Sequence, residues 1–229
     1  MASVAASFVQ RGKKIVAIGR NYAAHAKELN NPTPKEPFFF LKPTTSYVAS
    51  GGNVEIPSGI IAHYEVELGL VIGKGGRDIP QSSAEAHVAG YTLAVDMTAR
   101  NLQDKVKKQG LPWSAAKGFD TFTPIGPFIP KSTVKEPHDL RLLLKINGIT
   151  KQDGTTADMI FRIPRLIEHI SSIMTLEEGD LILTGTPEGV GALVAGDKVE
   201  CALADSDGKE LASLEFTATA RQGGYQFQG

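Results

Sequence analysis

The chain contains one cysteine, almost no net charge and no long apolar run. The single cysteine, Cys201, excludes an internal disulfide and favours a reducing compartment over secretion. The 24 basic and 25 acidic residues give a formal net charge of −1, which argues against binding to nucleic acid or to a membrane surface. The apolar runs are far shorter than the roughly 20 residues that span a bilayer. With 41% hydrophobic and 21% charged residues, the composition is that of an ordinary globular protein.

No repeat, low-complexity segment or obvious linker divides the 229 residues. A chain of this length can bury a substantial core without disulfides. We predict an N-terminal extension over residues 1–12 and a single domain over residues 13–229. The first charged residues are Arg11, Lys13 and Lys14, and the first acidic residue is Glu28. This basic polarity is typical of a transit peptide, but the first predicted strand, at Ile15, begins too early for a full presequence. Because the single cysteine favours a reducing compartment, we expect a mitochondrial or cytoplasmic protein.

Short alternating or apolar runs predict many strands and only a few helices. The predicted strands cover about residues 15–18, 38–41, 54–57, 64–72, 90–95, 140–147 and 181–183, with two more between 198 and 219. The predicted helices cover about residues 22–29, 82–88, 99–109 and 164–174. Asn30-Asn31-Pro32 ends the first helix, and Thr98 and Gly110 are the expected N-cap and C-terminal stop of the third. This mixture indicates an α+β fold that is mostly β.

Three carboxylates form the most informative group in the sequence. Glu65 and Glu67 lie two residues apart in a predicted strand, so their side chains point to the same face. Adjacent carboxylates repel, and one takes up a proton unless a cation lies between them. Asp96 follows the apolar run 91–95 and is a third candidate. Three carboxylates suit Mg²⁺, Mn²⁺ or Ca²⁺ rather than Zn²⁺, although the pair by itself is more often the solvated face of a half-buried sheet.

Several other side chains are candidates for chemistry. His25 and Glu28 lie three residues apart on one helical face, where a carboxylate can orient an imidazole that acts as a general base; the alternative is an exposed ion pair. Arg100 and Gln103 share a face of the third helix, and the arginine is placed to bind a substrate carboxylate. The alternative for them is ordinary helix surface.

Two lysines and one loop complete the candidates. Lys42 and Lys117 either point into a pocket or are solvated, as most lysines are. The segment 184–191, Thr-Gly-Thr-Pro-Glu-Gly-Val-Gly, follows an apolar strand and contains three glycines. Its backbone N–H groups are candidates for binding an anion, and a plain tight turn is the alternative. It does not end in the Gly-Lys-Ser/Thr of a Walker loop.

These segments together resemble the fumarylacetoacetate hydrolase superfamily. The matching pieces are Gly19-Arg20-Asn21-Tyr22-Ala23-Ala24-His25, Phe40-Leu41-Lys42-Pro43, His63-Tyr64-Glu65-Val66-Glu67-Leu68, Asp96-Met97-Thr98-Ala99-Arg100, Leu111-Pro112-Trp113, Lys117 and residues 183–191. They occur in the order of the family and cover nearly the whole chain. The resemblance is strongest to the short, single-domain branch that contains the acylpyruvases and oxaloacetate decarboxylases.

The resemblance implies a mixed β-sandwich roll, a homodimer and a bound Mg²⁺ or Mn²⁺. The metal carboxylates of the family fall on Glu65, Glu67 and Asp96. Its catalytic residues fall on His25, Glu28 and Lys117. Less closely matched substrate-binding positions fall on Arg20, Lys42, Arg100, Gln103 and Thr186.

The implied activity is metal-dependent C–C bond hydrolysis or lysis of small 2-oxo acids. Acylpyruvates such as acetylpyruvate and fumarylpyruvate would be hydrolysed, and oxaloacetate would be decarboxylated, through the same pyruvate enolate. Keto–enol tautomerisation of oxaloacetate is an alternative because it passes through a related enolate. An isomerase or decarboxylase of aromatic-ring-cleavage products is another. The alternative that is not an enzyme is a catalytically silent metal-binding or scaffold protein of the same fold.

Overall fold

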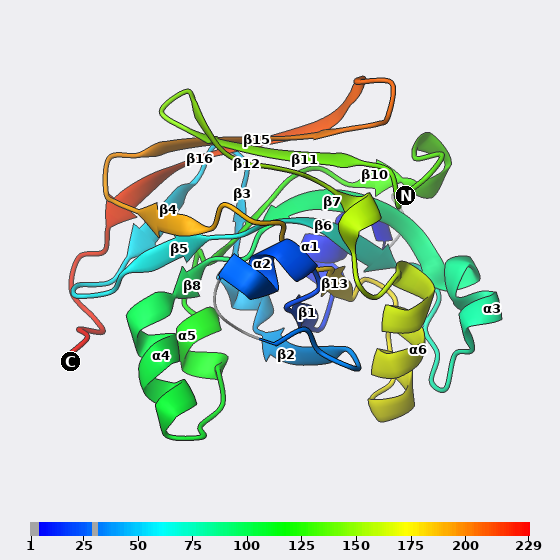
Figure 1. The fold of residues 1–229 in the computed structure, drawn as a ribbon, viewed down its shortest axis with the longest axis horizontal. Helices are drawn as coiled ribbons and strands as arrows, with labels where there is room; N and C mark the ends of the chain where they lie inside the picture. The colour runs from blue at the N-terminus through cyan, green and yellow to red at the C-terminus, as the bar shows by residue number, and fades with distance from the viewer. Residues whose placement is uncertain (1–4, 29–31) are drawn as a thin grey trace.

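A mixed eight-stranded sheet forms the centre of the computed structural model, which describes residues 5–28 and 32–229 (Figure 1). Its strand order is β2-β1-β13-β6-β7-β9-β3, with β10 paired to β7. The bounds are β1 Ile15–Gly19, β2 Phe38–Lys42, β3 Tyr47–Ala49, β6 Val66–Ile72, β7 Val88–Val95, β9 Thr123–Ile125, β10 Ile129–Pro130 and β13 Leu181–Leu183.

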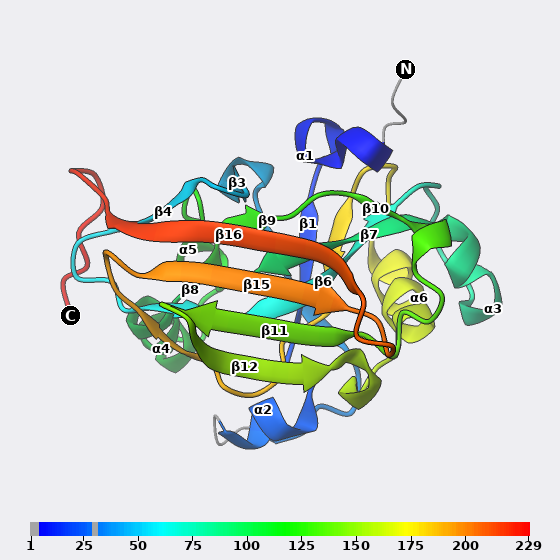
Figure 2. The same ribbon diagram turned by 90° about the horizontal axis from the view of Figure 1, so that it is seen from above.

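A five-stranded sheet lies over the central sheet (Figures 1 and 2). Its order is β12-β11-β15-β16-β4, with bounds β4 Asn53–Ile56, β11 Arg141–Ile146, β12 Ile149–Thr155, β15 Lys198–Ala204 and β16 Glu210–Ala220. The main apolar core contains side chains from both sheets, among them Leu68, Leu93, Leu142 and Leu203. A small third sheet joins β14 Gly191–Leu193, β5 Ala62–Tyr64 and β8 Thr98–Ala99. The predicted α+β, mostly β sandwich roll is confirmed.

The described part of the chain has six α-helices around the sheets: α1 Phe8–Arg11, α2 Ala23–Glu28, α3 Gln81–Ala84, α4 Arg100–Lys108, α5 Ser114–Lys117 and α6 Ile163–Ile173. Pro164 lies in the first turn of α6, which begins at Ile163. Gly110, at φ +67°, follows the end of α4, as predicted. The predicted cap of α4 is wrong, because α4 begins after Ala99 and Thr98 is part of β8. The predicted end of the first helix at Asn30-Asn31 falls outside the described residues.

Strand pairing brings distant segments of the sequence to one place. β1 runs parallel to β13, so the segment after Gly19 and the loop after Leu183 leave the same end of the sheet. β6 runs antiparallel to β7, with Val66 opposite Val95. The segments after Gly19 and Leu183 therefore lie close to the start of β6 at Val66 and to the end of β7 at Val95. This convergence places the candidate site.

The strand predicted over 64–72 is interrupted. β5 ends at Tyr64, β6 begins at Val66, and Glu65 lies at the break, where the chain passes from the small sheet into the central sheet. Every residue of β6 is buried. Leu68 and Leu70 belong to the main core, and Val71 belongs to a second apolar cluster with Phe8 and Ile15. The alternation in the sequence therefore marks two buried faces, and the solvated face of a half-buried sheet is excluded.

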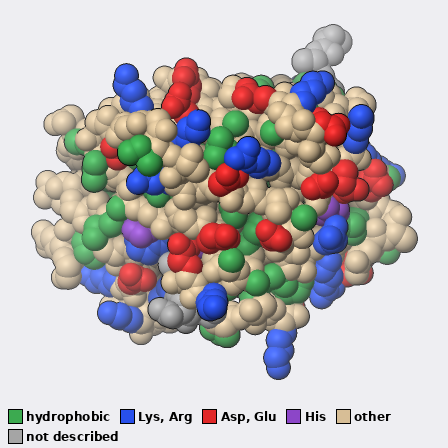
Figure 3. Space-filling model, turned by 45° about the horizontal axis from the view of Figure 1, so that its top comes forward, with side chains coloured by type: hydrophobic (Ala, Val, Ile, Leu, Met, Phe, Trp, Pro, Cys, Tyr) green, Lys and Arg blue, Asp and Glu red, His purple; other side chains and the backbone are tan. Residues whose placement is uncertain are grey.

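In the described part of the chain, no helix has the length and apolarity needed to cross a membrane. On the face drawn in Figure 3, acidic and basic side chains are interspersed. Phe8 of α1 is 2% exposed and belongs to a second apolar cluster with Ile15 and Ala17. Residues 5–11 of the predicted extension therefore pack on the domain.

Candidate active site

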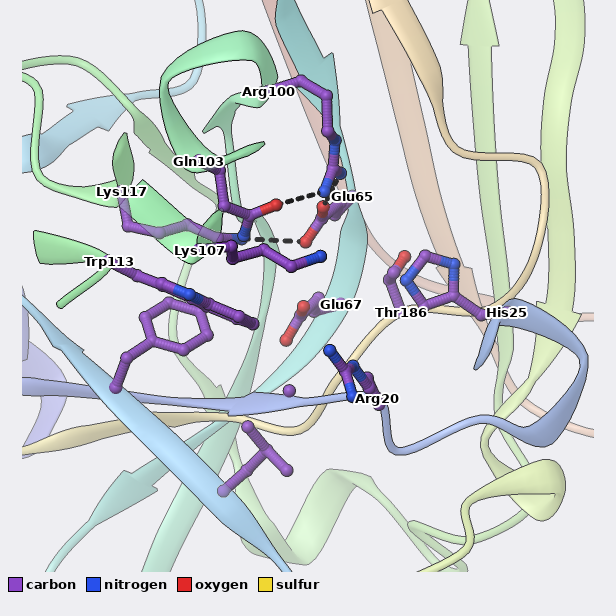
Figure 4. A pocket seen from close by; sticks show the side chains of 13 residues that line it. Arg20, His25, Glu65, Glu67, Arg100, Gln103, Lys107, Trp113, Lys117 and Thr186 are labelled. Atoms are coloured by element: carbon purple, nitrogen blue, oxygen red, sulfur yellow. Dashed lines mark hydrogen bonds and ion pairs between the residues drawn. The ribbon is translucent and has the colours of Figure 1, made fainter. Parts of the chain in front are cut away.

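Eight of the eleven site residues predicted from the sequence line one cavity at this convergence (Figure 4). The eight are Arg20, His25, Glu65, Glu67, Arg100, Gln103, Lys117 and Thr186. The other three lie behind this lining: Asp96 and Lys42 contact each other, and Glu28 contacts His25. The cavity is also lined by Ile18, Gly19, Phe40, Lys107 and Trp113.

The three candidate metal carboxylates lie together in the structure. One oxygen from each of Glu65, Glu67 and Asp96 lies within 4.8 Å of the others. Asp96 reaches the pair because β7 lies antiparallel to β6, and the Asp96 N–H donates to the Glu65 carbonyl at 2.8 Å. The three residues are between 1% and 7% exposed. Three buried carboxylates this close need opposite charge nearby.

Three cations supply part of that charge. Lys117 Nζ lies 2.9 Å from Glu65 Oε2 and 2.6 Å from Asp96 Oδ2. Lys42 Nζ lies 2.5 Å from Asp96 Oδ1. Arg100 Nη2 lies 2.6 Å from Glu65 Oε1. Each of these contacts is to Glu65 or Asp96, so the third carboxylate has no ion pair within the described ranges.

The pKa values follow from this uneven pairing. Burial by itself would raise the pKa of Glu65, but Lys117 and Arg100 hold it well below its usual value. Burial, and then the charges of Asp96 and Glu65, raise the pKa of Glu67 well above its usual value. The pKa of Lys117 is raised because Asp96 and Glu65 outweigh its burial. Glu67 is therefore the carboxylate of the cluster whose negative charge is least compensated by neighbouring cations.

A divalent cation fits this donor set. Three carboxylate oxygens within 4.8 Å form the hard, all-oxygen site that Mg²⁺ and Mn²⁺ prefer. A cation among them would supply the positive charge that Glu67 lacks and would oppose the effects of burial and of the Asp96 and Glu65 charges on its pKa. Residues 65, 67 and 96 are thus suited to hold such an ion.

The loop 184–191 binds two carboxylates of the protein itself. The Gly185 N–H donates to Glu67 Oε2 at 2.7 Å, and the Gly189 N–H lies 3.2 Å from Glu28 Oε1. Both glycines have positive φ, +94° and +93°, which glycine adopts without strain. The anions bound by this predicted anion-binding loop are therefore side chains of the site. The loop connects the carboxylate cluster to the histidine pair.

His25 and Glu28 are in contact. His25 Nδ1 lies 3.4 Å from Glu28 Oε2, and the histidine is 5% exposed while lining the cavity. Figure 4 shows His25 and Thr186 on the side of the cavity opposite Lys117 and Gln103. With Nδ1 facing Glu28, Nε2 is the ring atom available to a bound molecule.

Arg100 contacts several groups around the carboxylates. Its Nη1 donates to Gln103 Oε1 at 2.5 Å and its Nε to His63 Nδ1 at 3.3 Å. Burial, followed by Arg100, lowers the pKa of His63 to about 4, so the imidazole accepts this hydrogen bond in its neutral form. Thr98, predicted as a helix cap, donates instead to Glu65 Oε1 at 3.0 Å. The Arg100 guanidinium, predicted to bind a substrate carboxylate, thus binds the Glu65 carboxylate in this structure.

Lys42 holds Asp96 from behind. It does not line the cavity, it is 1% exposed, and its Nζ also donates to the Phe122 carbonyl at 2.7 Å. Burial lowers its pKa, and Asp96 opposes that effect. Neither expectation from the sequence, a pocket position or a solvated side chain, describes this buried contact.

Four residues of the site have no role predicted from the sequence: Phe40, His63, Lys107 and Trp113. Phe40 and Trp113 occur in the quoted motifs and pack with their ring centroids 5.4 Å apart. Lys107 lies four residues after Gln103 on the same face of α4, a spacing from which it could have been found. His63 precedes the carboxylate pair, and only its contact with Arg100 reveals its part in the site.

Comparison with known proteins agrees with this geometry. The profile of the fumarylacetoacetate (FAA) hydrolase C-terminal domain matches residues 14–218. The chain is 58% identical over 201 residues to the mitochondrial oxaloacetate tautomerase FAHD1 of Arabidopsis thaliana, covering 86% of this chain and 90% of the relative. It is 55% identical over 202 residues to the mitochondrial oxaloacetate decarboxylase of Dictyostelium discoideum, covering 87% and 93%.

Solved structures show the same fold. The fumarylpyruvate hydrolase of Pseudomonas aeruginosa, determined in complex with Mn²⁺ and pyruvate, superposes with a TM-score of 0.82 at 38% identity, covering 91% of this chain and 90% of that one. The yeast protein ynq8 superposes with a TM-score of 0.88 at 37% identity, covering 98% and 100%. The chain belongs to the fumarylacetoacetate hydrolase family.

Proposed function

We propose that this protein is a metal-dependent enzyme of small 2-oxo acids, and that its main reaction is the keto–enol tautomerisation of oxaloacetate. The observation that carries the proposal is one cavity lined by Glu65 and Glu67 of the buried carboxylate triad and by His25, which Glu28 contacts. The relatives named as oxaloacetate tautomerase and decarboxylase support oxaloacetate as the substrate. A catalytically silent protein has no need of a buried base beside a triad of this kind.

We propose Mg²⁺ or Mn²⁺ as the ion held by the triad. When bound, such an ion supplies Lewis-acid stabilisation for negative charge that develops on the substrate oxygen at C2. The Mn²⁺ in the related fumarylpyruvate hydrolase supports this choice of metal. The charge argument at Glu67 supports it independently.

Two further cations are available for a second carboxylate of the substrate. Arg20 and Lys107 line the cavity, and neither has an ion pair among residues 5–28 and 32–229. The Arg20 guanidinium lies 5.5 Å from the centre of the Phe38 ring, which orients it. We propose that these two residues bind the C4 carboxylate of oxaloacetate, while the C1 end faces the triad.

His25 is the proposed general base. Glu28 orients the ring through Nδ1, so that Nε2 accepts a proton from C3 of the keto form as the enol forms. The Lys117 ammonium, fixed by Glu65 and Asp96, stabilises the negative charge at the C2 oxygen. This oxygen then takes up a proton from solvent, and the His25 imidazolium returns its proton to solvent. The reverse sequence converts the enol into the keto form, so one base serves both directions.

The same residues can support two related reactions. In acylpyruvate hydrolysis, His25 would take a proton from water, the hydroxide would attack C4, and the C3–C4 bond would break to give a carboxylic acid and pyruvate. In decarboxylation, the C3–C4 bond of oxaloacetate breaks with loss of CO₂ and no water is consumed. The similarity to fumarylpyruvate hydrolase favours hydrolysis as the second activity.

We propose that residues 13–229 act as one catalytic domain, and that the chain forms a homodimer in mitochondria. The family match over residues 14–218 supports the domain. The names of the relatives, which place them in mitochondria, support the compartment. Sedimentation of the purified chain would test the dimer.

The test is a parallel assay of three reactions: loss of enol oxaloacetate, formation of pyruvate from oxaloacetate, and hydrolysis of acetylpyruvate. Each is measured with Mg²⁺, with Mn²⁺ and with EDTA. Metal-dependent turnover that is fastest for the tautomerisation supports the proposal. No metal-dependent turnover of any of the three, by protein that binds metal, would overturn it.

His25→Ala separates the roles of the base. It should abolish tautomerisation and hydrolysis but leave most of the decarboxylation, which needs no proton removal from C3 or from water. His169→Ala on α6, where the ring packs against Phe39 outside the cavity, is the matched control and should leave all three rates unchanged. Equal loss of all three activities in His25→Ala would contradict the assignment.

A further inference from the structure

The backbone of Val66, between the two glutamates, is held at both its N–H and its carbonyl. Val66 separates Glu65 from Glu67, so its orientation fixes the direction of both side chains. The Val66 N–H donates to Gln152 Oε1 at 3.0 Å, and the Val66 carbonyl accepts from Thr186 Oγ1 at 2.8 Å. Gln152 Nε2 donates to the same Thr186 Oγ1 at 2.8 Å. The three groups form a closed ring of hydrogen bonds.

Gln152 reaches this place from the other sheet. It belongs to β12, the edge strand of the five-stranded sheet, and is the one residue of β12 that is buried, at 1% exposure. The register with β11 shifts directly beside it, so that Leu144 lies opposite Gln152 and Lys145 opposite Thr150. An irregularity of this kind redirects a side chain. A buried amide is costly unless its polar atoms are bonded, and here Gln152 is bonded at both ends.

The same amide also anchors the loop that binds Glu67 and Glu28. Gln152 Nε2 lies 3.0 Å from the Pro187 carbonyl and 3.5 Å from the Glu188 carbonyl. On either side of these contacts, the Gly185 N–H holds Glu67 and the Gly189 N–H holds Glu28. One side chain therefore fixes the backbone between Glu65 and Glu67 and the loop that contacts Glu67.

We propose that Gln152 is a positioning residue for metal binding: through the Val66 peptide and the Thr186 loop it holds Glu65 and Glu67 in the orientation that a divalent cation requires. It does not line the cavity and touches neither carboxylate. The inference rests on the proposed metal site. A residue that merely stabilised the fold would change the melting temperature without changing the affinity for metal.

The test measures the dissociation constant of Mn²⁺ for Gln152→Met, from the signal of free Mn²⁺ in electron paramagnetic resonance. Methionine has a similar length but none of the hydrogen bonds. Loss of a group that hydrogen-bonds a metal ligand directly typically weakens metal binding by about 10- to 100-fold. Gln152 acts one contact further from the metal, so we expect a change at the lower end, about tenfold. Ser171→Ala is the matched control, because Ser171 is also buried and accepts the Ile79 N–H at 2.9 Å, remote from the site. It should lower the melting temperature and leave Mn²⁺ affinity unchanged.

A second variant protects the test against misfolding. Thr186→Val breaks the same ring at the Val66 carbonyl and should also weaken Mn²⁺ binding. If the ring acts as a unit, the double variant Gln152→Met/Thr186→Val should lose less affinity than the product of the two single losses. The inference is overturned if either folded single variant binds Mn²⁺ as tightly as the unmodified protein. Failure of the unmodified protein to bind Mn²⁺ would instead overturn the proposed metal site.

Discussion

Replacing Lys117 by methionine should separate metal binding from catalysis. The Lys117 ammonium lies 2.9 Å from Glu65 and 2.6 Å from Asp96, and its side chain is 2% exposed. Its removal leaves two buried carboxylates with one partner fewer each. Breaking a buried ion pair in this way costs about 3–5 kcal/mol. In a chain of 229 residues, each kcal/mol changes the melting temperature by roughly 2–4 °C, so the metal-free variant should melt about 6–20 °C lower.

Metal should restore more stability to this variant than it adds to the unmodified protein. The triad keeps its three carboxylates but faces one cation fewer, so its attraction for a divalent cation increases. A tenfold gain in affinity corresponds to about 1.4 kcal/mol, and we expect the stabilisation by saturating Mn²⁺ to increase by at least that amount. Turnover should nevertheless be lost, because Lys117 is the proposed partner of the C2 oxygen.

The assay is thermal unfolding followed by circular dichroism, with EDTA and with a series of Mn²⁺ concentrations. Lys14→Met is the control, because Lys14 Nζ lies 2.5 Å from the fully buried Asp180, outside the cavity. This control should also lower the melting temperature but gain from Mn²⁺ only what the unmodified protein gains. An equal or smaller gain in Lys117→Met would refute the charge argument for the site.

Three further changes test individual contacts. Glu67→Gln imitates the protonated carboxyl that its raised pKa favours, so the metal-free melting temperature at neutral pH should hold while Mn²⁺ no longer raises it. Burial and Arg100 lower the pKa of His63 in the folded protein to about 4, below its ordinary value of about 6.5. The neutral imidazole therefore contributes to stability fully above pH 6.5, and this contribution is lost as the pH falls towards 4. Denaturant unfolding of His63→Gln should show a smaller decrease in the free energy of unfolding between pH 6.5 and 4 than the unmodified protein does. Gly185→Ala places a Cβ 2.8 Å from Asn21 Cβ at φ +94°, so it should lower both the melting temperature and the Mn²⁺ affinity, and an unchanged affinity would show that the Glu67 contact is dispensable.

Local spacing in the sequence determined those parts of the site that lie close together along the chain. Glu65 and Glu67 point the same way because residues two positions apart in extended backbone face the same side. His25 and Glu28 touch because residues three apart share a helical face. The stop of α4 at Gly110 likewise depends on one residue that adopts positive φ. These features require only short-range geometry, and the structure shows each of them.

Only the tertiary structure decided how these local pieces combine. The register of β7 on β6 brings Asp96 to Glu65, and the break at Glu65 depends on the passage between two sheets. Nothing in the sequence around Lys42 indicates that it is buried behind Asp96. Gln152 lies among exposed polar residues of an edge strand, so no pattern marks it. Such contacts arise from sheet register and layer packing between segments far apart in the sequence. The periodicity of apolar residues predicts only which side chains of one segment share a face, and not which other segment that face will contact.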